Sequence, residues 1–126
     1  MTKLHEGGCL CGAVRYSVMG DPFLVGTCHC ADCRKESGAS FVTYAKWKRD
    51  GFTLKGDMKT FAGRSFCPKC GSRLLNLHED DVEIRIGSLD AAPNGFVPAQ
   101  EGWIKRREPW LQPVAGATQS AEDPPR

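Results

Sequence analysis

The segment Phe66-Cys67-Pro68-Lys69-Cys70-Gly71-Ser72 largely decides how this chain folds. Its two cysteines are separated by two residues and lie on a tight turn. Short stretches with the character of β-strands, residues 64–66 and 73–77, lead into and out of that turn. A strand, a turn that carries two thiolates and a return strand make up a zinc knuckle. The segment therefore predicts half of a metal site on a β-hairpin.

A second cysteine pair lies in Cys9-Leu10-Cys11-Gly12. Structural zinc is tetrahedral and closed, and four thiolates satisfy it. Gly12 and Gly71 follow the second cysteine of each pair, where glycine lets the backbone turn around the metal without a Cβ penalty. Combining the distant pairs predicts one structural zinc ion whose binding energy becomes folding energy. Its predicted ligands are Cys9, Cys11, Cys67 and Cys70. The alternative is that the pairs serve separate ions or a site between chains.

The other three of the seven cysteines are Cys28, Cys30 and Cys33. Three protein ligands and one exchangeable position are the pattern of a catalytic zinc site. A thiol is a natural ligand for the open position, since thiolates bind zinc and binding lowers the thiol pKa. The alternative is a site closed by a fourth protein ligand. The candidates for that ligand are His29, Asp32, His5 and His78.

Length, composition and charge set limits on the class of protein. The chain has 126 residues, with 25% charged residues and a net charge of +2, which suits one globular domain without a concentrated basic surface. The small net charge therefore argues against nucleic acid as a partner. No secretory leader and no run of about 18 apolar residues is visible. We expect a cytoplasmic protein with reduced thiols, because an odd cysteine count without an export signal argues against a disulfide framework.

Hydrophobic alternation and turn residues predict a mainly β fold of short antiparallel strands. Residues 6–12 resemble a turn, and one short helix is expected at residues 31–37, ended by Gly38. Residues 103–104 are expected to close the sheet. The predicted strands are residues 13–19, 23–27, 40–46, 52–55, 59–61, 64–66, 73–77 and 82–86. The aperiodic, polar end of the chain predicts one domain over residues 1–113 and a disordered tail over residues 114–126.

The cysteine-bearing segments resemble one known family. The similar segments are Gly8 to Tyr16, Cys28-His29-Cys30-Ala31-Asp32-Cys33-Arg34-Lys35, Ser37 to Phe41, and Phe66 to Ser72. They resemble the glutathione-dependent formaldehyde-activating enzymes, the GFA-domain family, with all seven family cysteines in order. The resemblance covers about Glu6 to Leu111, and Trp103 to Trp110 is similar to that family's C-terminal end.

The resemblance implies a fold and an activity. The expected fold is Mss4-like, with stacked antiparallel β-sheets, zinc knuckles and one short helix. The family's structural zinc maps onto Cys9, Cys11, Cys67 and Cys70, and its catalytic zinc maps onto Cys28, Cys30 and Cys33. The implied reaction joins glutathione to formaldehyde, formally a carbon–sulfur lyase reaction in reverse. The rival hypotheses are a non-catalytic zinc module that binds a protein or nucleic acid, and a thiol-redox or metal-handling protein.

Arg34 and Ser37, which follow Cys33 in the sequence, are candidates for substrate binding. A zinc ion with three thiolates carries a net charge of −1, so Arg34 could offset that charge or hold a substrate carboxylate. The hydroxyl of Ser37 could hydrogen-bond to a bound thiol compound. The simpler alternatives are a solvated cation for Arg34 and a helix-end hydroxyl for Ser37. The sequence names neither a general base nor an oligomeric state.

Overall fold

The computed structural model describes residues 3–125, which fall into two compact units. The first unit runs to Phe23 and resumes over Ala45–Gly95, and the second comprises Leu24–Tyr44 and the chain from Phe96 onward. The sequence predicts one domain, but the chain leaves the first unit at Phe23 and returns to it at Ala45. Each unit holds one of the cysteine clusters, so each is described by itself.

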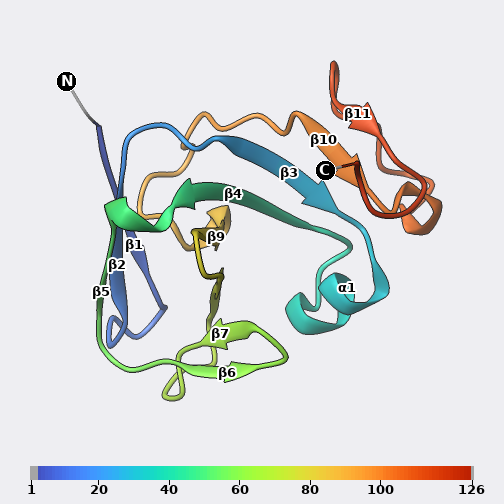
Figure 1. The fold of residues 1–126 in the computed structure, drawn as a ribbon. Coiled ribbons are helices and arrows are strands. Elements are labelled where there is room, and N and C mark those ends of the chain that lie inside the picture. Colours follow the sequence, from blue (N-terminus) through green and yellow to red (C-terminus); the bar gives the residue numbers. More distant parts are fainter. Residues whose placement is uncertain (1–2, 126) are drawn as a thin grey trace. The chain divides into compact units, whose positions relative to one another are not determined.

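The first unit contains two groups of antiparallel strands. One has the order β1 (Leu4–Gly8), β2 (Arg15–Met19), β5 (Phe52–Lys55). The other joins neighbours along the chain in a meander of β6 (Lys59–Phe61), β7 (Arg64–Phe66), β8 (Arg73–Leu77) and β9 (Asp81–Arg85), and β6 and β7 form the green hairpin of Figure 1. Short 3₁₀ turns lie at Arg49–Gly51, just before β5, and at Ile86–Ser88, just after β9. The predicted strands 52–55, 59–61, 64–66 and 73–77 are confirmed, whereas residues 4–8 form a strand that the sequence analysis missed.

The core of the first unit follows from alternation along its strands. Val82 and Ile84 are fully buried, and between them Glu83 is only partly covered. Leu74 and Leu75 of β8 are also fully buried. Burying side chains of this size stabilises a fold by about 1.5–3 kcal/mol each. Among the aromatic residues, Trp47 is buried and donates its indole N–H to the carbonyl oxygen of Gly20 at 2.9 Å.

The second unit is built on β3 (Leu24–Cys28), which leads into α1 (Ala31–Ser37). The strand order is β11 (Thr118–Gln119), β10 (Gln100–Gly102), β3, β4 (Val42–Lys48), and β4 passes from this unit into the first. Gly38 ends α1 in the left-handed conformation, as predicted. The pairings elsewhere in the two sheets include the expected antiparallel ones, but β10 runs parallel to both β3 and β11. Parallel neighbours require a long connection, and β10 is distant from both in sequence.

The C-terminal segment differs from its expectation of disorder. The N–H groups of Thr118 and Ser120 donate to the carbonyl oxygens of Ala99 and Glu101, at 3.0 and 2.9 Å. Without β11, β10 would be an edge strand with unpaired backbone groups, so a polar segment can pair there without apolar anchors. Trp103 forms no strand: its φ of 57° and ψ of 41° place it before the 3₁₀ turn Ile104–Arg106. Within residues 3–125, no helix is both long and apolar enough to span a membrane.

Candidate metal centres

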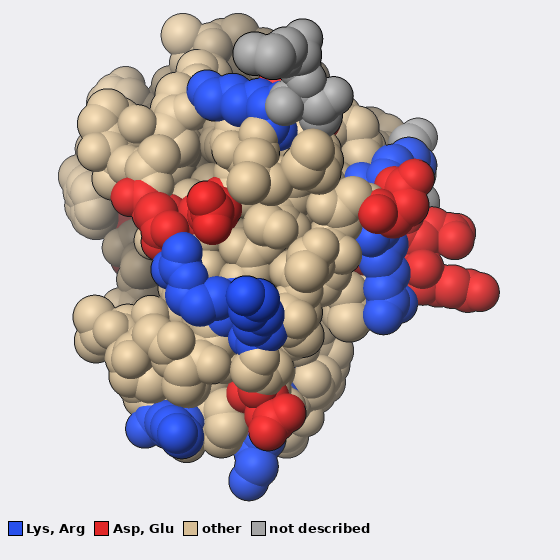
Figure 2. Space-filling model, turned by 90° about the vertical axis from the view of Figure 1, so that its left-hand side faces the viewer, with Lys and Arg blue, Asp and Glu red and all other residues tan. Residues whose placement is uncertain are grey.

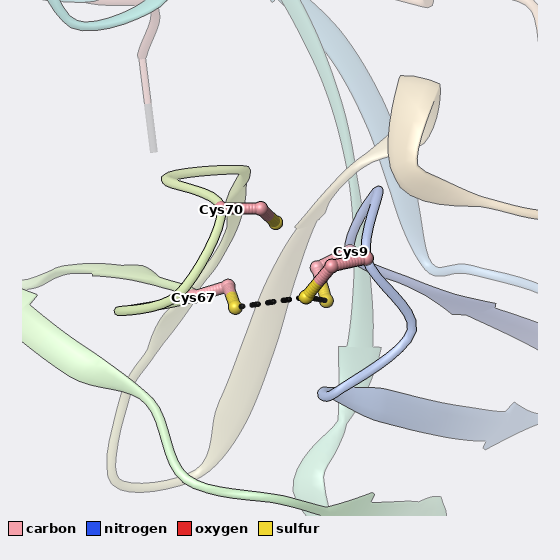
Figure 3. A group of neighbouring side chains, drawn as sticks. Cys9, Cys67 and Cys70 are labelled. Carbon is pink, nitrogen blue, oxygen red and sulfur yellow. Dashed lines mark hydrogen bonds between the residues drawn. The ribbon is translucent and has the colours of Figure 1, made fainter.

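The first unit brings Cys9, Cys11, Cys67 and Cys70 together, as predicted from their spacing. Their sulfur atoms all lie within 4.8 Å of one another. The Cys9 and Cys11 sulfurs are 3.6 Å apart, and the Cys11 and Cys67 sulfurs are 3.8 Å apart. Figure 3 shows sulfurs from two opposing turns pointing toward one another. Tetrahedral zinc with Zn–S bonds of about 2.3 Å requires sulfurs about 3.8 Å apart, so the cluster fits such an ion.

Hydrogen bonds to these sulfurs favour the ionised form that binds metal. The N–H groups of Val14 and Lys69 point to the sulfurs of Cys9 and Cys67, at 3.2 and 3.4 Å. The Ser72 hydroxyl lies 3.2 Å from the Cys70 sulfur, and bonds from the hydroxyl and backbone of Ser72 lower the pKa of Cys70 to about 5. A donor to a thiolate lowers its pKa because it stabilises the charge. A bond from the backbone of Ala13 lowers the pKa of Cys11, but contact with the Cys9 sulfur and burial outweigh it and raise that pKa to about 11. The donors therefore favour a thiolate at Cys70 but not at Cys11.

Glycine and serine complete this cluster. Gly12 and Gly71 have φ values of 81° and 78°, which are left-handed conformations that most residues avoid. The expectation of tight glycine turns after each pair is thus confirmed. The Ser72 oxygen also accepts a hydrogen bond from the N–H of Leu10 at 2.9 Å, which joins the two turns directly. The sequence analysis missed this residue, although its place right after the knuckle was a usable signal.

The second unit brings Cys28, Cys30 and Cys33 together, also with sulfurs within 4.8 Å of one another. Cys28 ends β3, Cys30 caps α1, and Cys33 lies in the first turn of that helix. The Cys30 sulfur accepts the N–H of Cys33 at 3.3 Å. Contact with the Cys28 sulfur and burial raise the pKa of Cys33 in the metal-free chain. Three thiolates this close repel one another, and a shared cation would relieve that repulsion.

The donor set of this second cluster contains only sulfur. Among residues 3–125, no histidine nitrogen or carboxylate oxygen belongs to the group of mutually close ligand atoms. The candidate fourth ligands His29, Asp32, His5 and His78 are therefore not gathered with the three sulfurs. Thiolate ligands suit zinc, and three of them leave one tetrahedral position for an external group. The residues present thus fit a three-coordinated metal with one position available.

His29 points away from the cysteines that flank it in sequence and binds a buried carboxylate. Its Nε2 lies 2.9 Å from Oε1 of Glu101, and both side chains are only 2% exposed. The N–H of Val114 and the amide of Gln119 each donate to Glu101 Oε2 at 2.8 Å. Burial alone would raise the pKa of Glu101, but the bonds from His29, Gln119 and Val114 outweigh it and keep that pKa below its usual range. Sequence reasoning missed Glu101, because no periodicity marks an isolated glutamate as buried.

The two proposed substrate-binding residues have partners inside the protein. The Arg34 guanidinium donates to Glu108 at 2.5 Å and to the carbonyl oxygen of Arg106 at 2.8 Å. The Ser37 hydroxyl donates to the carbonyl oxygen of Cys33 at 2.7 Å, the local bond of a helix-end serine. The Arg34 contacts tie the helix to the chain that follows β10, whereas the Ser37 bond stays within the helix. Substrate contact by Arg34 or Ser37 stays a prediction.

Two cavities lie apart from the cysteines, both lined only by residues of the first unit. Their volumes are about 320 and 290 Å³. The larger is lined by Lys3, Leu4, His5, Glu6, Leu89, Asp90, Ala91, Pro93 and Asn94. Neither lining contains a metal-ligating sulfur, so the chemistry of the chain is not explained by these cavities. Figure 2 shows positive and negative side chains interspersed on the face that it presents, as the net charge of +2 suggests.

The chain is mainly β and carries a four-sulfur and a three-sulfur cluster that could each hold a metal ion, which defines its class in outline. Comparison with known proteins identifies its family. The model of the family "Glutathione-dependent formaldehyde-activating enzyme" (GFA) matches residues 4–106. This chain belongs to that family. The resemblance inferred from the cysteine segments is thereby confirmed.

Similar proteins agree with this placement. An "Uncharacterized lyase" of Schizosaccharomyces pombe is 27% identical over 75 residues, covering 56% of this chain and 55% of the yeast protein. A "Putative glutathione-dependent formaldehyde-activating enzyme" of Halomonas elongata is 31% identical over 91 residues, covering 56% of this chain and 54% of that protein. The chain thus spans about half the length of the curated relatives that it matches.

A solved structure supports the fold alone. The crystal structure of a Rhodobacter sphaeroides protein has a TM-score of 0.55 and 20% sequence identity, and covers 74% of this chain and 97% of the other. The mainly β class with one short helix is therefore confirmed, apart from the parallel pairings of β10.

Proposed function

We propose that this chain is a zinc-dependent enzyme of the carbon–sulfur lyase type, which joins a small thiol to an aldehyde or cleaves the adduct. The observation that carries the proposal is the three-sulfur cluster without a fourth protein ligand among residues 3–125. The family and the names of the two relatives point the same way. Glutathione and formaldehyde are the proposed substrates, with zinc in both clusters and a cytoplasmic setting that keeps the thiols reduced.

The chain's own residues prepare the site for this reaction. A zinc ion held there would supply a Lewis-acidic position at which a thiol loses its proton near neutral pH. Cys28 and Cys30 are half-buried, so the cluster is accessible from one side, while Cys33 is buried in α1. The helix and β3 place the three sulfurs around a single position, so a thiol bound there would be presented to an incoming aldehyde in a defined orientation.

The proposed reaction balances without an oxidant or reductant. The sulfur–carbon bond forms as the π bond of the aldehyde carbonyl breaks. The thiol proton ends on the new hydroxyl oxygen, and the reverse reaction returns it to sulfur. Because both directions conserve electrons, no redox cofactor is needed.

Exchange NMR tests the proposal directly. With ¹³C-formaldehyde and glutathione at equilibrium, the zinc-loaded protein is expected to speed exchange between free aldehyde and the S-hydroxymethyl adduct above the uncatalysed rate. Cys30→Ser is expected to abolish the acceleration, because it removes a ligand from the open cluster.

The matched control is Lys35→Ala, which leaves all seven cysteines in place and truncates an exposed side chain of the same helix. It separates loss of the cluster from general damage to α1. An acceleration that survives in Cys30→Ser would show that surface thiols, rather than the cluster, react with the aldehyde. A protein without acceleration for any of a panel of thiols and aldehydes would favour the non-catalytic zinc module instead.

A further inference from the structure

We propose that Glu101 is a positioning residue that couples the C-terminal segment, residues 114–123, to the three-cysteine cluster. The inference depends on a metal in that cluster but not on the thiol–aldehyde reaction. All of the residues involved belong to the second unit.

The two oxygens of the Glu101 carboxylate face different parts of the chain. Oε1 accepts from Nε2 of His29, and Oε2 accepts from the N–H of Val114 and the amide of Gln119. Arg107 approaches Oε2 at 3.8 Å. One buried carboxylate therefore joins the cysteine-bearing segment to the C-terminal segment.

His29 transmits this contact to the ligands because of its place between them. In an extended chain, neighbouring side chains point to opposite sides, so Cys28 and Cys30 face the metal position while His29 faces β10. The N–H of His29 also donates to the carbonyl oxygen of Gly102 at 3.1 Å. His29 thus positions Cys28 and Cys30 from the side opposite the metal position, through one side-chain and one backbone hydrogen bond to β10.

The charge of Glu101 explains why the coupling is tight. A buried carboxylate is tolerated only where its oxygens are well paired, and removal of one partner leaves an expensive unsatisfied charge. The C-terminal segment supplies two of the three hydrogen bonds. Losing that segment would leave His29 as the main partner and loosen the hold on Cys28 and Cys30. Outer-shell partners of metal ligands typically change metal affinity by about 10–100-fold.

Metal retention in the full-length protein tests the inference. Cobalt is loaded into both clusters and its release to a chelator is followed, and Cys30→Ser identifies the phase that belongs to the three-cysteine cluster. Glu101→Gln keeps the side-chain volume but places an NH₂ group against one set of donors. It is expected to speed that phase by about 10–100-fold and leave the four-cysteine phase unchanged. Equal acceleration of both phases, or of neither, would overturn the inference.

Two further variants separate coupling through Glu101 from simple loosening of the segment. Gln119→Ala removes one donor to the carboxylate. Asp123→Ala removes the 2.8 Å bond between the Asp123 carboxylate and the indole N–H of Trp103, but leaves the donors to Glu101 in place. Gln119→Ala is expected to accelerate metal release and Asp123→Ala is not. If both act alike, the C-terminal segment only stabilises the fold.

Hydrogen exchange provides the reciprocal test, since coupling between sites must act in both directions. Compared with the metal-loaded wild type, Cys30→Ser is expected to speed exchange at the N–H groups of Val114 and Ser120. The N–H of Cys67, bonded to the carbonyl oxygen of Ser72 at 3.0 Å, lies in the other unit and serves as the reference. Unchanged protection at Val114 and Ser120 would overturn the coupling, even if Glu101→Gln fails to fold.

Discussion

At the scale of single residues, backbone space limits the first unit most strongly at Gly56. This glycine follows β5 and has a φ of 93°. A Cβ added there would lie 2.1 Å from the carbonyl oxygen of Ala13, which a real structure cannot accommodate. Ala13 belongs to the turn that carries Cys9 and Cys11, so the constraint extends to the metal ligands.

Gly56→Ala is therefore expected to lower the free energy of unfolding by about 2–4 kcal/mol, because left-handed strain and overpacking add. The matched control is Gly63→Ala. Its φ is 80°, but a Cβ there meets nothing within 4 Å, so only about 1–2 kcal/mol of strain is expected. Urea unfolding of both variants measures the difference. Equal losses would show that the contact with Ala13 relaxes without cost.

The lowered pKa of Glu101 predicts a pH dependence of stability. A carboxyl whose pKa falls on folding stabilises the native state above its unfolded pKa of about 4.3, and this contribution is lost as pH drops through the folded value. His29 and Arg107 are the titratable and charged side chains that face it. Relative to Glu101→Gln, the wild type is expected to be more stable by about 3 kcal/mol at pH 7. Unfolding experiments should show that this difference in stability shrinks below about pH 4, because a protonated Glu101 resembles glutamine. A difference in stability that is independent of pH would mean that Glu101 is not ionised in the folded protein.

At the scale of elements, β11 and the residues around it change the interpretation of the C-terminal end. The N–H groups of Trp103 and Ile104 donate to the carbonyl oxygens of Glu122 and Ser120 at 2.9 and 3.1 Å. The N–H groups of Thr118 and Ser120 also donate to backbone carbonyls at β10. Together these four hydrogen bonds hold the C-terminal segment on both sides of Gly102. A Cβ on Gly102 would lie 2.9 Å from the ring of Pro124, so the segment is also closely packed there.

Removal of the chain from residue 115 onward is expected to lower Tm by about 5–10 °C. Each lost hydrogen bond contributes about 0.5–1.5 kcal/mol, and each kcal/mol changes Tm by several degrees in a domain of this size. Differential scanning calorimetry provides the measurement. A disordered tail, as expected from the sequence alone, would leave Tm unchanged, so the experiment decides between the two descriptions.

At the scale of the whole molecule, the two clusters are expected to have unequal roles. The four-sulfur cluster joins turns that are distant in the sequence of the first unit, whereas the three-sulfur cluster lies within one strand–helix connection. A metal that closes a long loop adds more to folding than one bound by a local segment.

Metal analysis of protein purified without chelator is therefore expected to give two zinc ions per chain. Cys67→Ser should lose the folded state of the first unit, which near-UV circular dichroism and NMR would detect. Cys30→Ser should stay folded and keep one ion. The assignment of structural and functional roles would be reversed if Cys30→Ser proved to be the poorer folder.

Much of this molecule could be predicted because its signals are local. Three kinds of signal depend on neighbours within a few residues: thiolate pairs on glycine turns, a helix ended by Gly38, and the hydrophobic alternation around Val82 and Ile84. The resemblance to the GFA family rests on the same cysteines. Such local signals were sufficient to predict the two clusters, the mainly β class and the family.

Other features could not be predicted, because no local pattern encodes pairings between distant segments. The parallel neighbours of β10, the ordered C-terminal segment and the buried Glu101 depend on contacts between residues far apart in sequence. A polar segment can be disordered or can complete an edge strand, and a glutamate can face water or several hydrogen-bond donors. The free energy of the segment or of the glutamate in each state depends on which hydrogen-bonding partners the fold brings to it. Those donors, supplied here by His29, Val114 and Gln119, exist as a set only once the chain has folded.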